Sequence, residues 1–349
     1  MSADQPTTIA EPLLTLLKNA GDAIAAGEVP GDLGACIDGL GALPPEAAGL
    51  VEAEVASLLG LFGRHAPVRA VNPWTAWLLP PRQRDDIVLL SAQPALAALF
   101  LFHRDGYVRE AALARLDAAL DGPFWVAALA RRLNDWVPQV RAAAATAARR
   151  AFAKTDPAVL AAAARFLIGR RNAWRRWGAE AAVLDEALGR EDVADALAAL
   201  FEAPGAGAKT AMLRDALRGA AMDRHLLRLA RCASLPAVRA EAMRTLLRGR
   251  ARWPVGYRRT WIDKSHGLWR RTLTFQERPV TRPVALATLA GLAARDRSPQ
   301  VRRLAAEAAV RHGDALPNLE EVTGLLRADR SRAVREAIAF VDRRRAGPA

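Results

Sequence analysis

One segment of the sequence combines the residue types that suit contact with a polyanion. Between 244 and 282 the chain has eleven basic residues against two acidic ones, and five aromatic residues are interleaved with them. Basic side chains contact phosphates and aromatic rings stack on bases, so this mixture is typical of single-stranded or flexible nucleic-acid binding. The residues predicted to bind a partner or nucleic acid are Arg252, Trp253, Tyr257, Arg258, Arg259, Trp261, Lys264, Trp269, Arg270 and Arg271. The structural alternative is that the tryptophan rings fill a defect in the fold while the arginines are solvated.

A second basic surface is predicted nearer the middle of the chain. Its residues are Arg149, Arg150, Arg170, Arg171 and Arg176. Trp174 and Trp177 lie beside it. Their three-residue spacing predicts one face of a helix and a place in the core.

The sequence offers little for catalysis or metal binding. The five histidines include none beside a glutamate and none paired at helical spacing, although a metal needs convergent ligands. The stretch from Gly205 to Thr210 lacks the phosphate-loop pattern, because Ala203 and Ala208 stand where glycines are required. We therefore expect no catalytic residue, no metal, no cofactor and no small-molecule substrate, that is, a protein that is not an enzyme.

Charge is distributed unevenly along the chain. Residues 1–62 carry one base and nine acids, a net charge of −8, whereas 63–349 carry 49 bases and 28 acids, a net charge of +21. A body this basic predicts an anionic partner, either an acidic protein surface or a nucleic acid. The competing explanation is compositional, since nearly all the bases are arginine and the chain is rich in alanine.

Several features predict a soluble cytoplasmic protein without a membrane partner. Apolar residues make up 52% and charged residues 25%, which suits a packed core. Cys36 and Cys232 cannot build a disulfide framework. The first residues lack the pattern of a secretory signal, and the apolar stretch 87–102 is too short and too interrupted to span a membrane.

A Val-Arg motif recurs along the chain and predicts the elements that carry these residues. Five copies have both residues: Val108-Arg109, Val140-Arg141, Val238-Arg239, Val301-Arg302 and Val334-Arg335. Degenerate copies are predicted at Trp174-Arg175, Ala208-Lys209 and Trp269-Arg270. Successive basic positions are then 30 to 34 residues apart, and a fixed period of this size indicates a solenoid of repeated units.

Each unit is predicted to contain two helices, with Val-Arg at the start of the second. Pro138, Pro236 and Pro299 stand two residues before the valine, where a first helical turn tolerates proline. Apolar or small residues then return three and four positions on. The recurring arginines are expected near the inter-helix turns, paired with aspartates or main-chain carbonyls. Essentially no sheet is expected.

The motif resembles HEAT repeats, particularly the short bacterial HEAT-like kind. Asp135, Asp296 and Asp329 each precede their valine by five residues and strengthen the resemblance. It implies an all-α fold, a right-handed α-solenoid of about eight helix pairs over 92–345, with an irregular basic and aromatic patch at 249–266. Because such repeats serve as scaffolds, it also implies a non-enzymatic binding scaffold that docks an acidic partner on its basic surface.

Residues outside the repeats form two further predicted segments. Residues 1–62 are expected to form an acidic helical cap, with helices over 9–26 and 46–62. The stretch 63–91 contains prolines and tryptophans and is expected to be an ordered connector.

An alternative function follows from a second resemblance. The stretch 149–157, RRAFAKTDP, is similar to the region around the active-site arginine of HEAT-like DNA alkylation-repair glycosylases, which would place that arginine at Arg150. Asp105 would stand for the aspartate of that family, although Tyr107 occupies the neighbourhood where a tryptophan is expected. The alternative is thus a DNA- or RNA-binding protein related to these glycosylases.

Overall fold

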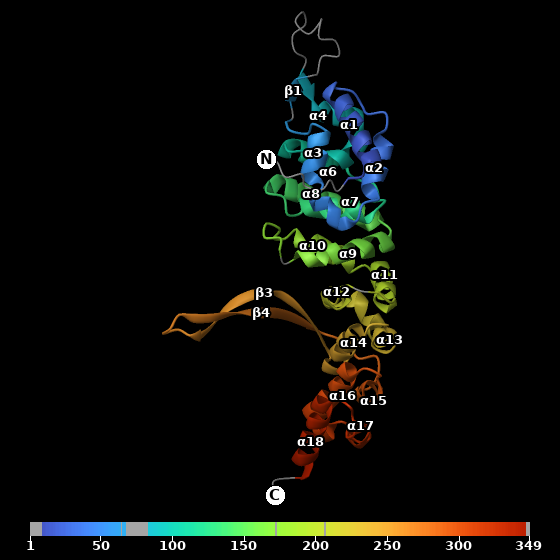
Figure 1. The fold of residues 1–349 in the computed structure, drawn as a ribbon, viewed down its shortest axis with the longest axis vertical. Helices are drawn as coiled ribbons and strands as arrows, with labels where there is room; N and C mark the ends of the chain where they lie inside the picture. The colour runs from blue at the N-terminus through green and yellow to red at the C-terminus, as the bar shows by residue number, and fades with distance from the viewer. Residues whose placement is uncertain (1–8, 64, 68–82, 172, 206, 347–349) are drawn as a thin grey trace, which may run out of the picture. The chain divides into compact units, whose positions relative to one another are not determined.

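The residues that the structure describes are mostly helical and include two two-stranded sheets. A computed structural model describes residues 9–63, 65–67, 83–171, 173–205 and 207–346 (Figure 1). These residues form two compact units, which divide between Ala187 and Leu188. The division falls inside the segment 92–345 that the sequence assigns to one repeat array.

The first unit contains helices α1 to α10 and a small sheet. Its α-helices are α1 (Glu11–Ala25), α2 (Leu33–Gly41), α3 (Glu52–Leu58), α4 (Asp86–Ala92), α5 (Ala97–Phe100), α6 (Gly106–Arg115), α7 (Pro123–Arg132), α8 (Pro138–Lys154), α9 (Pro157–Arg171) and α10 (Ala181–Leu188), whose last residue crosses the division. Two 3-10 helices, η1 (Pro45–Gly49) and η2 (Pro94–Leu96), complete it. α6 packs on α8, and α7 packs on α9, so consecutive helix pairs stack.

The N-terminal helices pack directly on this stack. α1 and α3 lie where helices are predicted, whereas α2 lies between the two predicted helices. α2 and η1 contact α7, and Glu52 forms ion pairs with both Arg131 and Arg132. Burial alone would raise the pKa of the Glu52 carboxyl, but the two guanidinium groups outweigh it, and the pKa lies below its usual value.

The predicted connector is only partly within the described residues. β1 (His65–Pro67) pairs antiparallel with β2 (Gln83–Asp85), so this segment contains a short sheet. Residues 68–82 lie outside the part of the chain that the structure describes.

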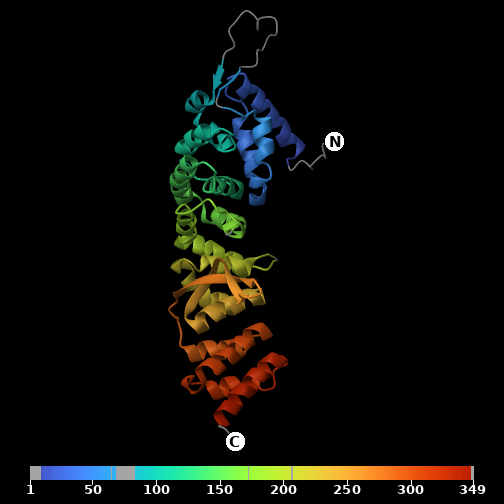
Figure 2. The same ribbon diagram turned by 90° about the vertical axis from the view of Figure 1, so that its left-hand side faces the viewer.

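The second unit repeats a helix pair four times. Its α-helices are α11 (Glu191–Glu202), α12 (Lys209–Ala216), α13 (Leu226–Cys232), α14 (Pro236–Arg248), α15 (Leu286–Ala294), α16 (Pro299–His312), α17 (Leu319–Leu326) and α18 (Arg332–Ala346). Two 3-10 helices, η3 (Ala220–His225) and η4 (Gly313–Ala315), lie between them. The even-numbered helices contact one another in succession, and of the odd-numbered ones α11 contacts α13 and α15 contacts α17. The unit therefore has two helical layers (Figure 1), and Figure 2 shows the helices of the unit stacked one after another.

The predicted position of the Val-Arg motif is confirmed for the five full copies. They lie in the first turns of α6, α8, α14, α16 and α18, and Lys209 opens α12 as predicted. Two degenerate copies are wrong. Trp174-Arg175 lies in the non-helical segment between α9 and α10, and Trp269-Arg270 lies in a β-strand.

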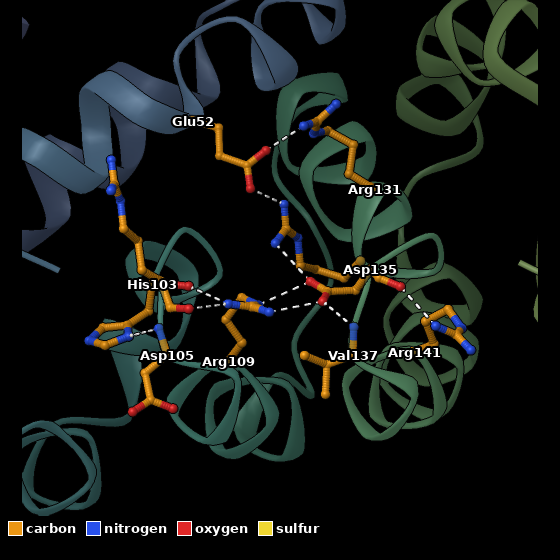
Figure 3. Close-up of polar contacts among 10 residues, drawn as sticks. Glu52, His103, Asp105, Arg109, Arg131, Asp135, Val137 and Arg141 are labelled. Carbon is orange, nitrogen blue, oxygen red and sulfur yellow. Dashed lines mark hydrogen bonds and ion pairs between the residues drawn. The ribbon is translucent and has the colours of Figure 1, made fainter. Parts of the chain in front are cut away.

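The recurring arginines form a ladder of hydrogen bonds at the inter-helix turns (Figure 3). Arg109 Nη1 donates to the main-chain oxygens of His103 and Arg104, at 2.8 and 2.9 Å. Its Nε and Nη2 donate to the carboxylate of Asp135 in the next repeat, at 3.0 and 2.8 Å. The main-chain oxygen of Asp135 in turn accepts from Arg141. We call the bonds made by one recurring arginine a rung of the ladder, and the rung of Arg109 joins two repeats. The predicted pairing with aspartates and carbonyls is confirmed here.

The same contacts recur in the second unit. Arg239 bonds the carbonyls of Ala233 and Ser234 and the carboxylate of Asp296, and Arg302 bonds the equivalent carbonyls and the carboxylate of Asp329. Among the described residues, Lys209 donates only to the carbonyls of Ala203 and Pro204. In the next repeat Ala233 stands in the aspartate position, so lysine occurs where the rung has no carboxylate to bind.

One rung reveals an insertion. Arg109 and Asp135 are 26 residues apart, and Arg302 and Asp329 are 27 apart, but Arg239 and Asp296 are 57 apart. The additional 30 or 31 residues match the stretch from Arg250 to Pro279, which forms a long antiparallel hairpin of β3 (Arg250–Asp263) and β4 (Leu268–Pro279). The copy predicted at Trp269-Arg270 is therefore part of an insertion, and its spacing matches the repeat period by coincidence.

The hairpin corrects two predictions, that the chain has essentially no sheet and that 249–266 is an irregular patch. Helix α14 ends at Gly249, whose φ of 65° turns the chain out of the helix. β3 and β4 are then rich in aromatic and β-branched residues, which favour strands. The sequence D-K-S-H-G supplies the turn, where Gly267 also adopts a φ of 65°.

Candidate functional site

The hairpin is anchored at its root and projects from the helices of the second unit (Figure 1). Arg278 donates to the main-chain oxygens of Leu217, Arg218 and Gly219 and to the carboxylate of Asp223. The side chain of Trp253 is buried there, and Arg218 lies over its ring. From Val255 to Asp263 the strand continues for nine residues, or roughly 30 Å at about 3.3 Å per residue.

The strand register assigns the site residues to two faces. Residues directly opposite in an antiparallel pair share a face, and successive residues alternate. Tyr257 is opposite Leu273, Arg259 opposite Arg271, and Trp261 opposite Trp269. We call the side formed by Arg252, Tyr257, Arg259, Trp261, Trp269, Arg271, Leu273 and Phe275 the aromatic face. The opposite face carries Trp253, Arg258, Thr260, Arg270 and Thr272.

On the aromatic face, arginines stack on exposed rings. The guanidinium of Arg259 lies 3.9 Å from the ring centroid of Trp261 and 4.7 Å from that of Trp269. Arg271 lies 4.5 Å from the ring of Tyr257, and Arg252 lies 3.9 Å from that of Phe275. The rings remain open to solvent, with Tyr257 60%, Trp269 46% and Trp261 43% exposed. Within the described residues, none of these three arginines has a carboxylate partner.

The tip of the hairpin is held by a side-chain cap. The carboxylate of Asp263 accepts from the main-chain N–H and hydroxyl of Ser265, at 2.9 and 2.5 Å, and pairs with Nδ1 of His266 at 2.8 Å. The hydroxyl of Ser265, followed by His266, lowers the pKa of Asp263 to about 2. The carboxylate is therefore charged at neutral pH and fixes the turn that brings Trp261 opposite Trp269.

The structure separates the ten predicted binding residues into groups. It brings Arg252, Tyr257, Arg259, Trp261, Trp269 and Arg271 onto the aromatic face. Arg258 and Arg270 are exposed on the opposite face, Lys264 is exposed in the turn, and Trp253 is buried at the root. The structural alternative thus holds for Trp253 but not for Trp261 and Trp269, which lie open to solvent.

A cavity at the root of the hairpin was not anticipated from the sequence. We call it the root cavity. It has a volume of about 460 Å³ and lies between helices α12, α14 and α16 and the root of the hairpin. Its lining residues are Arg214, Glu241, Arg244, Thr245, Arg248, Arg250, Arg252, Phe275, Glu277 and Arg311. Arginines from three separate helices converge there, and their distance in sequence hides this from any local pattern.

Most residues of the second predicted basic surface, in the first unit, have structural partners. Arg149 pairs with Glu186, and Arg171 pairs with Asp185 and lies over the ring of Trp177. Arg170 stacks on Phe166, and Arg176 is exposed. The predicted helix around Trp174 and Trp177 is wrong, because the described residues between 173 and 180 are non-helical. The ring centroids of Trp174 and Trp177 are nevertheless 4.8 Å apart, and Trp177 is buried.

Asp105 and Arg150 do not converge. Asp105 caps the start of α6, where its carboxylate accepts from the N–H of Tyr107. Arg150 Nη2 donates to the carbonyls of Leu113, Ala114 and Leu116, at the other end of the same helix. Ten residues of helix separate the two ends by about 15 Å. Both residues serve α6, and the pair that the glycosylase resemblance implies is not assembled.

Over the described ranges, no group of three or more His, Cys, Asp or Glu residues is placed to hold a metal ion. None of the helices in the part of the chain that the structure describes is long and apolar enough to cross a membrane. No family model matches the chain, and no curated protein matches it in sequence.

Proposed function

We propose that this chain is a non-enzymatic, HEAT-like helical scaffold that binds single-stranded nucleic acid on the aromatic face of its hairpin. The observation that carries the proposal is the set of exposed rings held by arginines without carboxylate partners among the described residues. A guanidinium stacked on a ring keeps its N–H groups available for phosphate oxygens. The rings present π surfaces on which bases of any sequence stack, at about 1–3 kcal/mol per base.

The exposed rings favour nucleic acid over an acidic protein surface. Attraction to carboxylates needs only the positive charge, which the exposed arginines of either hairpin face supply. Exposing Trp261, Trp269 and Tyr257 to water, by contrast, leaves large apolar surfaces uncovered. Stacked bases cover such rings while the adjacent phosphates meet the arginines. An acidic protein partner is the other outcome that the test below can return.

The helical repeats support the proposal as a rigid base. The ladder ties the turn before α14 to the turn before α16, on either side of the insertion. Arg278 and Arg282 then fix the second strand and the segment after it to the ends of α12 and α14. We infer that the repeats present the hairpin and that the bases stack on the hairpin alone.

The test uses two variants that remove the same charge from opposite faces. In the first, Arg259→Gln and Arg271→Gln alter the aromatic face; in the second, Arg258→Gln and Arg270→Gln alter the opposite face. We expect the first to weaken binding of a single-stranded oligonucleotide at least about tenfold, and the second less than about threefold. Fluorescence anisotropy at several salt concentrations measures both, and thermal unfolding checks that both variants are folded.

Three results would contradict the proposal. Equal losses in the two variants mean that only net charge matters. Equal affinity for an oligonucleotide and for an abasic strand of the same length means that the rings do not stack on bases, and an acidic partner is then favoured. If the wild type does not bind the oligonucleotide at low salt, the hairpin has a structural role only.

A further inference from the structure

The root cavity has a surplus of positive charge. Six arginines and two glutamates line it. Glu241 pairs with Arg214 and Arg244, at 2.8 and 2.6 Å, and Glu277 pairs with Arg250 at 2.9 Å. Within the described parts of the chain, Arg248, Arg252 and Arg311 have no ion-pair partner. The cavity therefore holds three guanidinium groups that form no ion pair with a carboxylate of the described residues.

The electrostatics of Arg248 show the same surplus. Burial, followed by the positive charges of Arg311 and Arg244, lowers the pKa of Arg248. Its charged form is therefore disfavoured by its surroundings, and an anion bound in the cavity would relieve that repulsion. The paired glutamates also orient Arg214, Arg244 and Arg250, which lowers the entropic cost of a multidentate contact.

The root cavity is large enough to hold a small ligand. Its volume of about 460 Å³ lies within the range of roughly 300–1,000 Å³ that holds small ligands. Its wall on α14 contains the buried residues Glu241 and Thr245, which are 6% and 3% exposed.

The cavity is continuous with the aromatic face. Arg252 and Phe275 belong to both, and from Phe275 the face continues along β4 to Leu273, Arg271 and Trp269. The seven residues from Trp269 to Phe275 span about 20 Å of strand. A strand whose bases stack on this face would therefore bring one of its ends into the root cavity.

We propose that the root cavity binds the phosphate monoester at the end of a nucleic-acid strand that lies on the aromatic face. This inference rests on the proposed function and specifies which part of the strand the scaffold recognises. A monoester carries about −1.5 to −2 charges at neutral pH and presents three strong acceptor oxygens, whereas a phosphodiester carries one charge. Three guanidinium groups without carboxylates match the monoester better, because Arg binds phosphate oxygens in bidentate fashion.

The experiment compares short single-stranded oligonucleotides of one sequence with a 5′-phosphate, a 3′-phosphate or hydroxyl groups at both ends. The wild-type full chain is expected to bind one phosphorylated form at least about tenfold more tightly than the hydroxyl form. The double variant Arg248→Gln/Arg311→Gln should lose this preference and bind the hydroxyl form as the wild type does. Arg303→Gln is the matched control, because Arg303 lies on α16, is exposed and does not line the cavity.

The outcomes separate this inference from the proposed function. Equal affinity of the wild type for all three oligonucleotides, or a preference that survives in the double variant, overturns the monoester site while the proposed function stands. Failure to bind any strand overturns both. A mononucleotide 5′-phosphate that binds as tightly as the phosphorylated strand means that the cavity serves a free nucleotide, which also overturns the proposal. Thermal unfolding shows whether the double variant is folded, and Arg311→Gln alone serves if it is not.

Discussion

Arg239 and Arg259 lie twenty residues apart and have opposite surroundings. Arg239 is 1% exposed, with its guanidinium between the carboxylate of Asp296 and two main-chain carbonyls. Arg259 is exposed on the hairpin, with its guanidinium over two tryptophan rings. Arg239 has its hydrogen-bond partners inside the protein, whereas the N–H groups of Arg259 face solvent and can donate to a bound ligand.

The comparison shows how one residue type serves folding in one place and, as proposed here, binding in another. A buried guanidinium is stable only when its charge and its donors are matched, so the ladder cannot exchange its aspartate for an external anion. An exposed guanidinium on a ring loses little hydration and stays available. Arginine count or net charge therefore predicts a binding surface poorly. Whether a guanidinium group is available for binding depends on whether it already has a partner within the protein.

The largest expected effect is on stability, from Arg239→Met. The substitution leaves the carboxylate of Asp296 and two carbonyls without their donor, and breaking such a buried pair costs about 3–5 kcal/mol. Denaturant unfolding should show this loss, while oligonucleotide binding by the folded fraction stays unchanged. Arg332→Met is the control, because Arg332 is 85% exposed in an ion pair within one helix and should cost less than about 1 kcal/mol. A loss below about 1 kcal/mol for Arg239→Met would remove the distinction between the two classes.

The next effect is the loss of binding after removal of the hairpin. The ends of the insertion meet, since the N–H of Val280 donates to the oxygen of Gly249 at 2.9 Å. Replacing 250–279 by a two-residue turn should keep the helical circular dichroism and abolish oligonucleotide binding. Unfolding should become easier by about 1–3 kcal/mol, because Asp223 loses the guanidinium of Arg278. A shortened chain that cannot fold would show that the hairpin belongs to the core.

These two regions also differ in how far the sequence predicts them. The ladder follows from local spacing, because valine, arginine and the aspartate before them have fixed places relative to one helix start. The hairpin was missed because its 30 residues nearly equal one repeat, so a period count passes over it. Gly249, the alternating aromatic and β-branched residues and the turn after Asp263 are the local signals that predict it.

The candidate site was predictable in composition but not in geometry. The excess of bases and rings between 244 and 282 identifies the segment, yet only the strand register separates Arg259 from Arg258. The root cavity needs Arg214 and Arg311, which lie outside that segment and reach it through helix packing. No pattern in a single stretch of sequence contains that information.

A smaller effect should follow from single aromatic substitutions on the hairpin. Trp261→Ala or Trp269→Ala removes a stacking surface worth about 1–3 kcal/mol per base, which corresponds to about 5- to 150-fold weaker oligonucleotide binding. Stability should change by less than about 0.5 kcal/mol for an exposed position. Tyr107→Ala provides the control, since Tyr107 is 71% exposed in the first unit and no arginine of the described residues stacks on its ring. Equal effects at all three positions would mean that exposed rings bind without help from arginine.

The smallest effect concerns how the stability of the protein falls at acidic pH. Hydrogen bonding to Arg302 lowers the pKa of Asp329, so this carboxylate adds stability that is complete above its unfolded pKa of about 4 and is lost as the pH falls through the folded value. The melting temperature of the wild type should therefore fall between pH 5 and pH 3. In Asp329→Asn the fall should be smaller, because that titrating group is gone. Identical pH profiles would show that the rung does not contribute through its charge.

The ladder also determines how unfolding can spread. Each rung joins the turn of one repeat to the aspartate of the next. Unfolding of one repeat therefore leaves a buried charged group in the neighbouring repeat without its partner. Local opening is then penalised at the boundaries between repeats, and neighbouring helix pairs exchange their amide hydrogens together. At Lys209, where Ala233 replaces the aspartate, this coupling is absent. The second unit should accordingly open first at the boundary between α12 and α13, leaving the helix pairs from α13 to α18, which the bonds of Arg239 and Arg302 join, as the last cooperative block.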